Sequence, residues 1–132
     1  MKLNEKKCKY MVFSRSESKF ATRIQVNNIY LERVPTMKML GVWLSEDLTW
    51  SKNCQEICIK AYSRISMLTK LKYVGVSTED LLDIYILNIR SVTEYCSVAF
   101  HSSLSQADSA KIERVQKKCL KVILGDMYIR AR

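Results

Sequence analysis

The chain has 132 residues, of which 48% are hydrophobic, and carries a formal charge of +9. Three glycines and one proline leave little room for flexible linkers or low-complexity sequence, so long uninterrupted elements are expected. Residues 1–45 hold nine Lys and Arg against three Asp and Glu, and this basic balance favours polyanionic partners such as nucleic acid.

Residues 1–45 predict a small antiparallel sheet. Residues 10–13 form a short β-type run, and the polar residues 14–19 predict a turn. Segments 24–26 and 29–31 alternate around Asn27-Asn28, and because asparagine tolerates positive φ this pattern favours a tight hairpin. Beyond Pro35, the apolar run 39–44 predicts the next strand.

From residue 49 the apolar period changes to 3.6, which predicts a helix that ends near Gly75. Its apolar stripe consists of Cys54, Ile57, Cys58, Ala61, Ile65 and Leu68. Trp43 and Trp50 flank the turn before this helix. We expect both rings to pack in a core, although either could also support a nucleotide.

Ser77, followed by Glu79 and Asp80, predicts the capped start of a second helix, whose apolar residues run from Leu81 to Cys96. This helix is apolar on much of its circumference, so we expect it to be the most buried of the helices. Ser105 and Asp108 repeat the capping pattern for a third helix, which ends at Gly125. The fold class is therefore α+β: a small sheet or hairpin at 1–45, then a helical domain at 46–132 that holds a three-helix bundle between 49 and 125.

The cysteines and acids give no catalytic or metal site. Four of the five cysteines fall on apolar faces of predicted helices, which indicates reduced, buried thiols in an intracellular protein: Cys54, Cys58, Cys96 and Cys119. The adjacent acids, Glu46-Asp47 and Glu79-Asp80, both lie at predicted helix starts, where capping explains them, and His101 suits a solvated loop. The first ten residues are charged and lack the apolar segment of a secretory signal, and the sequence has no apolar run of about 18 residues, so we expect neither a signal peptide nor a membrane span.

The basic residues of the helices are regularly spaced. Lys111, Arg114, Lys118 and Lys121 follow the third helix at i, i+3, i+7 and i+10, and Lys60 and Arg64 are i, i+4 on the first. Such a stripe can be a solvated helix face, a set of phosphate contacts along a duplex, or a surface for a membrane or an acidic partner.

Four blocks of the sequence resemble, in order, blocks of the reverse transcriptases of non-LTR (LINE-type) retrotransposons. Residues 3–13 are similar to L-N-x-x-K-T-x-x-M-x-F, with Cys8 in the place of Thr. Residues 38–50 are similar to K-x-L-G-V-x-L-D-x-x-L-T-W, with Ser45 in the usual Asp place. Residues 84–96 resemble I-Y-x-x-x-I-R-S-V-L-E-Y-A, and residues 113–125 resemble L-E-x-V-Q-K-R-A-L-R-I-I-x-G.

The resemblance implies that 1–45 closes a polymerase palm and that the helices form a thumb, which binds a template–primer duplex. Lys7 and Lys9 would lie near the nucleotide site, and Leu40, Gly41 and Val42 would form the primer grip. The family's aspartate pair, Tyr/Phe-x-Asp-Asp, would precede Met1 with the rest of the palm and the fingers. Mg²⁺ would bind only in that longer enzyme, because metal binding needs those carboxylates, so we expect this chain to be inactive.

Two other interpretations stay open beside the duplex-binding one. The chain could be a non-catalytic basic helical module that binds a protein partner or an acidic surface. It could also have no activity alone, since a sheet without its neighbours exposes an edge and an apolar face.

Overall fold

The structure is a computed structural model that describes residue 4 and residues 7–13 and 23–125. Within these residues strands come first and helices follow, so the chain is α+β, as the sequence predicts. It divides into two compact units, Met1–Thr49 and Trp50–Arg132. The predicted turn at 14–19 and the first residue of the resemblance, Leu3, lie outside the described residues.

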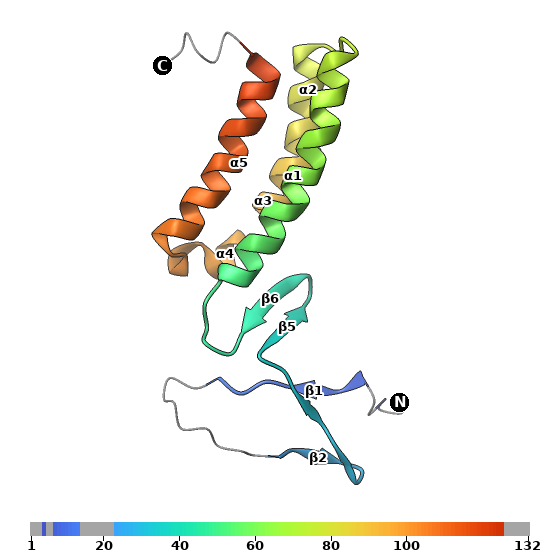
Figure 1. The fold of residues 1–132 in the computed structure, drawn as a ribbon, viewed down its shortest axis with the longest axis vertical. Coiled ribbons are helices and arrows are strands. Elements are labelled where there is room, and N and C mark those ends of the chain that lie inside the picture. Colours follow the sequence, from blue (N-terminus) through green and yellow to red (C-terminus); the bar gives the residue numbers. More distant parts are fainter. Residues whose placement is uncertain (1–3, 5–6, 14–22, 126–132) are drawn as a thin grey trace. The chain divides into compact units, whose positions relative to one another are not determined.

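The described residues of the first unit form three two-stranded pairings (Figure 1). β1 (Lys9–Tyr10) pairs in parallel with β4 (Glu32–Arg33), β2 (Gln25–Val26) pairs antiparallel with β3 (Ile29–Tyr30), and β5 (Thr36–Met39) pairs antiparallel with β6 (Val42–Ser45). The prediction of a small antiparallel sheet or hairpin is thus confirmed only in part: two pairings are antiparallel hairpins, whereas β1 and β4 pair in parallel and the strands do not join into one sheet. These strands of two to four residues are shorter than is usual, so each pairing contributes few backbone hydrogen bonds.

Two hairpin turns in this unit have both central residues at positive φ, as a type I′ turn requires. Asn27 (φ 48°) and Asn28 (φ 65°) join β2 to β3, which confirms the predicted hairpin. Leu40 (φ 48°) and Gly41 (φ 89°) join β5 to β6 between the paired residues Met39 and Val42. The predicted continuous strand over 39–44 is thus wrong, because an apolar leucine occupies a turn position that usually holds a polar residue.

The second unit is built on two long helices, α1 (Ser51–Tyr73) and α5 (Gln106–Leu124). Between them come α2 (Thr78–Ile84), the π-helical segment η2 (Tyr85–Arg90), α3 (Ser91–Thr93), α4 (Ser97–Phe100) and the 3₁₀ turn η3 (His101–Ser103). α1 packs against α5 and against the α2–α3 segment (Figure 1). The core holds most of the predicted α1 stripe, with residues of the other segments: Cys58, Ala61, Ile65, Leu68, Leu81, Ile89, Val115, Cys119 and Ile123.

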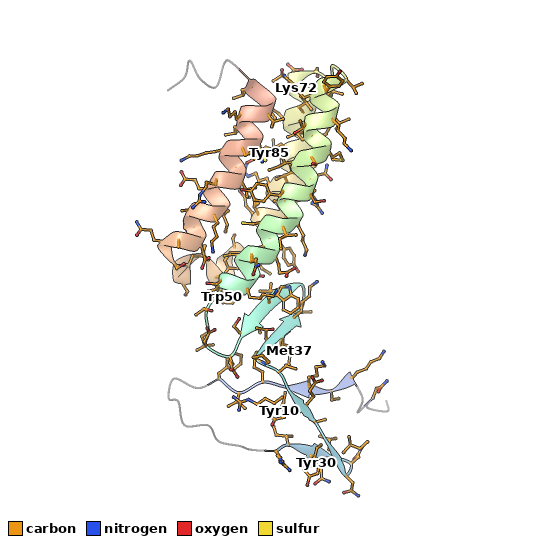
Figure 2. All side chains as sticks on the ribbon, in the orientation of Figure 1. Tyr10, Tyr30, Met37, Trp50, Lys72 and Tyr85 are labelled. Atoms are coloured by element: carbon orange, nitrogen blue, oxygen red, sulfur yellow. The ribbon has the colours of Figure 1, made fainter. Side chains whose placement is uncertain are left out.

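Side-chain hydrogen bonds connect α1 to α5 near both ends of the helix pair. At the starts of the helices, the hydroxyl of Ser51 donates to Asp108 Oδ2 at 2.8 Å. At their ends, Lys72 Nζ donates to the carbonyl oxygen of Ile123 at 2.9 Å, and Figure 2 shows Lys72 in the last turn of α1. The two helices therefore run in the same direction.

The predicted caps at Ser77 and Ser105 and the predicted stop at Gly125 are confirmed. The Oγ atoms of Ser77 and Ser105 accept hydrogen bonds from the backbone N–H groups of Asp80 and Asp108, both at 3.1 Å, which satisfies an amide in the first turn of α2 and of α5. Gly125 follows α5 with a φ of 52°. At the start of α1, Trp50 packs on the buried ring of Phe100 with ring centroids 5.7 Å apart, in agreement with the expected core role.

The predicted second helix, from Leu81 to Cys96, is wrong in two respects. It changes to a π-helical backbone at Tyr85, and Cys96 takes a left-handed conformation (φ 55°) that interrupts the helical backbone before α4. It is also not the most buried segment, since Leu87 is 71% exposed and Tyr95 53% exposed. Among the described helices, α1 and α5 pack against this segment, and apolar side chains on its other side are exposed.

Candidate nucleic-acid interface

One side of α5 carries a row of four basic side chains, the basic stripe: Lys111, Arg114, Lys118 and Lys121. All four residues are exposed, whereas Val115, Cys119 and Ile123 on the neighbouring side of the helix are fully buried. The spacing of three and four residues places the four cations above one another along the helix. The amphipathic pattern of α5 thus keeps these charges at the surface, because the buried residues occupy the side of the helix that faces the core.

Asp108 holds the first member of the stripe. Lys111 Nζ lies 2.8 Å from Asp108 Oδ1, while the hydroxyls of Ser51 and Ser105 both donate to Oδ2 at 2.8 Å. These donors, with Lys111 first, hold the pKa of the buried Asp108 carboxyl below its usual range, and the same bond raises the pKa of Lys111. Lys111 is therefore partly neutralised at the foot of the stripe.

Lys118 lies against an aromatic residue that the sequence did not single out. Its Nζ atom sits 5.2 Å from the ring centroid of Tyr62 on α1, a cation–π contact. Tyr62 is 42% exposed, and Ile59, one turn earlier on the same helix, is 56% exposed. Tyr62 directly follows the buried Ala61, so the sequence could have placed its ring beside the apolar stripe of α1. Which helix the ring would contact depends on tertiary packing, which the sequence pattern does not contain.

Arg114 and Lys121 flank Lys118 on α5, one turn away on either side. Within the part of the chain that the structure describes, no ion pair or side-chain hydrogen bond engages either of them. A cation that is not already paired can neutralise a phosphate without first breaking an internal contact. Arg114 and Lys121 are thus the members of the stripe best suited to bind an anion.

Lys60 and Arg64 do not join this surface. Tyr62 and Arg64 are two residues apart, which is about 200° around a helix. Tyr62 faces α5, whereas Arg64 donates through Nη1 to the carbonyl oxygen of Asn88 in η2. Lys60, one turn before Arg64, lies exposed on that second side. The structure therefore divides the sequence-predicted basic residues of α1 and α5 between two surfaces.

The bond from Arg64 also has a structural role. The π-helical turn disturbs the regular pairing of backbone carbonyls, and three side chains donate to carbonyl oxygens of this region. These are Arg64 to Asn88, Ser91 to Leu87 at 2.6 Å, and Thr93 to Arg90 at 3.0 Å. Arg64 is better described as a stabiliser of η2 than as a free cation.

The remaining predicted residues lie in the first unit. Lys9 Nζ forms an ion pair with Glu32 Oε2 at 2.9 Å across the parallel β1–β4 pairing, and Lys7 is exposed. Leu40 and Gly41 form the tip of the β5–β6 hairpin, with Leu40 87% exposed, while Val42 is buried. The hairpin thus presents a leucine side chain and a glycine backbone outwards and keeps the third residue of the predicted primer grip inside.

The acid pairs have structural partners, although not both those predicted. Asp80 accepts from the Ser77 hydroxyl at 2.6 Å, as a capping residue does. The expectation that Glu46-Asp47 caps a helix is wrong, since α1 begins four residues later and has no acid in its first turn. Glu46 instead pairs with Arg33 at 3.1 Å, and Asp47 accepts from the amide and hydroxyl of Thr49, which lowers its pKa.

The thiols divide by burial. Cys54, Cys58 and Cys119 are buried, as predicted, and burial raises the pKa of Cys54 and of Cys119 to about 11. The prediction that Cys96 is buried is wrong, because its left-handed backbone turns it into an exposed position. Across the described residues no cluster of three or more His, Cys, Asp or Glu side chains could hold a metal ion.

Comparison with known proteins gives no match to a family model, to a curated protein or to a solved structure. Among the described helices none is both long enough and apolar enough to cross a lipid bilayer.

Proposed function

We propose that this chain is the C-terminal palm, primer-grip and thumb portion of a non-LTR retrotransposon reverse transcriptase, and that it binds a template–primer duplex through the basic stripe of α5. The observation that carries the proposal is this stripe, four exposed cations in a row along a helix whose neighbouring side is buried. The four ordered sequence blocks supply the family, and in this proposal 46–132 is a thumb-like three-helix domain.

The dimensions of the stripe suit a duplex backbone. From Lys111 to Lys121 the helix rises about 15 Å, and a strand of duplex carries one phosphate per about 3.4 Å of axis. The stripe therefore spans about four phosphates. Contacts of this kind fix the position of a duplex without reading its sequence, so the proposed binding is sequence-independent.

The first unit would contribute the primer grip in this proposal. The exposed tip of the β5–β6 hairpin combines the Leu40 side chain with Gly41, whose missing Cβ lets a backbone approach closely. Lys7 and Lys9 would lie near the nucleotide. Lys60 and Arg64, which the sequence also suggested, lie on the side of α1 that does not face the α5 stripe. They are therefore left out of the proposed duplex contact.

The chain would not polymerise alone. The sequence contains no adjacent pair of aspartates, and polymerases use close carboxylates to hold two Mg²⁺ ions. Purified chain, incubated with a primed RNA template, deoxynucleotides and Mg²⁺, is expected to add no nucleotide to a labelled primer. Template-dependent extension would contradict this part of the proposal.

Duplex binding can be measured by fluorescence anisotropy with a labelled RNA–DNA heteroduplex over a series of salt concentrations. We expect log K to fall linearly with log salt, with a slope of about −0.9 for each phosphate neutralised. Replacing both Arg114 and Lys121 by Gln should reduce the slope by about 1.8 on this scale and weaken binding. Glutamine keeps helix propensity close to that of the basic residues.

The matched control is the double variant Lys60→Gln, Lys70→Gln, which removes the same two charges from exposed positions of α1. It is expected to change the salt slope and the affinity little. Equal losses in the two double variants would indicate attraction by net charge alone, and the α5 interface would be wrong. An affinity of the unaltered chain that ignores salt would refute phosphate contact altogether.

A specific observation favours a second candidate function, a non-catalytic helical module that binds a protein partner. The segment from η2 to α4 exposes large apolar side chains, with Leu87 71%, Ile86 47% and Val98 97% exposed. Exposed apolar groups of this kind mark protein interaction sites when they gather. A salt-insensitive partner whose binding is lost in Leu87→Ser, with duplex affinity unchanged, would favour this candidate.

A further inference from the structure

Tyr62 is the exposed aromatic ring that the packing of α1 against α5 places beside the basic stripe. The contact with Lys118 shows that one face of the ring is turned towards the α5 cations, 5.2 Å from the Lys118 ammonium. At 42% exposure the residue is neither a core residue nor fully solvated. A half-open ring next to a row of cations is the combination found where proteins hold unpaired bases.

Each part of this arrangement matches one part of a nucleotide. The ring offers a π-face on which a base can stack, and every base has such a face, so the contact tolerates any sequence. Arg114 and Lys121, one turn to either side of Lys118 on α5, offer charges for the phosphates before and after that base. A duplex buries its bases in the stack, so only an unpaired base can reach the ring.

Lys118 does not block the ring permanently. Its side chain ends in a flexible ammonium that can leave the ring and pair with a phosphate, and a solvated cation–π contact is weaker than a base–aromatic stack. The exposed Ile59, one turn before Tyr62 on α1, extends the apolar surface on which the base would rest. The same movement would therefore open the ring and bring the cation to the strand.

We propose that Tyr62, together with Arg114, Lys118 and Lys121, forms a subsite for an unpaired nucleotide, so that the chain binds a single-stranded segment next to a duplex in preference to a blunt duplex. This inference rests on the proposed nucleic-acid function and adds a substrate class to it: a strand end, an overhang or a junction. Tyr62 would contribute through its ring and not through its hydroxyl.

The test uses the full chain and two labelled ligands that share one duplex, the first blunt and the second with a short single-stranded overhang. The unaltered chain should bind the overhang ligand at least five-fold more tightly, in line with the strength of a single base stack. Tyr62→Leu should remove this preference and leave blunt-duplex affinity unchanged. Tyr62→Phe is the matched control, because it keeps the ring, and it should keep the preference.

A spectroscopic signal separates stacking from a general effect on folding. The overhang carries 2-aminopurine, whose emission falls when the base stacks, and we expect quenching with the unaltered chain and Tyr62→Phe but not with Tyr62→Leu. Circular dichroism establishes that the variants are helical. Equal affinity of the unaltered chain for both ligands, or quenching that survives Tyr62→Leu, would overturn the subsite while leaving duplex binding intact. Absence of binding to either ligand would overturn the proposed function as well.

Discussion

Replacing Asp108 with Ala tests whether one buried carboxylate joins the starts of α1 and α5. The side chain of Asp108 is 4% exposed and accepts from Ser51, Ser105 and Lys111, each at 2.8 Å. Asp80 provides a matched control, because it occupies the same position of the same capping pattern in α2 but is exposed, and its hydrogen bonds join it to Ser77 of its own helix start.

The expected loss of stability follows from these contacts. Each hydroxyl bond to the buried carboxylate is expected to contribute about 1–1.5 kcal/mol, and the negative charge at the helix N-terminus about 0.5 kcal/mol. The pair with Lys111 adds little, because the lysine side chain is 48% exposed and solvent screens the interaction. Asp108→Ala should therefore cost about 3 kcal/mol, and Asp80→Ala less than about 1 kcal/mol.

Urea unfolding followed by circular dichroism measures both variants. The pKa of Asp108 is lowered in the folded chain, so its contribution is present above the unfolded pKa of about 3.9 and is lost as pH falls through the folded value. The difference in the free energy of unfolding between the unaltered chain and Asp108→Ala should thus be largest near pH 7 and decrease towards pH 3. Equal losses of stability in the two variants at pH 7, or a loss in Asp108→Ala that does not depend on pH, would show that the Asp108 carboxylate does not join the two helices.

Two further outcomes are expected. In the folded chain at pH 8, the exposed Cys96 should react rapidly with a thiol reagent. Cys54 and Cys119 should react only after urea is added, because they are buried and their pKa values are raised to about 11. Rapid labelling of Cys119 without denaturant would contradict the packing of α5. Leu40→Asn should stabilise the β5–β6 hairpin by about 0.5–1 kcal/mol, because asparagine tolerates positive φ better than leucine. Amide hydrogen exchange at Val42 should then be slower, and faster exchange would contradict the strained turn at Leu40. If Leu40 contacts a primer, the same variant should also bind the heteroduplex more weakly.

Local chemistry explains which features could be predicted from the sequence. The caps at Ser77 and Ser105, the stop at Gly125 and the Asn27-Asn28 turn each depend on a side chain and its immediate backbone. The apolar stripes of α1 and α5 follow from a period that the sequence displays directly. These features are independent of how the helices meet.

Other features depend on contacts that no local pattern contains. The change to a π-helical backbone at Tyr85 and the positive φ of Leu40 go against local preference, so a search for periodicity overlooks both. The division of the basic residues between two surfaces was hidden for another reason. Spacing along one helix shows that Lys118 and Lys121 share a side, but only packing shows that Tyr62 faces that side and that Arg64 faces η2.

The two hydrogen bonds between α1 and α5 also determine the axial register of the pair. Ser51 with Asp108 at the starts and Lys72 with Ile123 at the ends are separated by most of the length of both helices. A slide of one helix past the other by a single turn, about 5.4 Å, would break both contacts at once. This register keeps Lys118 beside Tyr62. A nucleic-acid strand that lies along α5 would therefore contact the cations and the ring at fixed distances from one another.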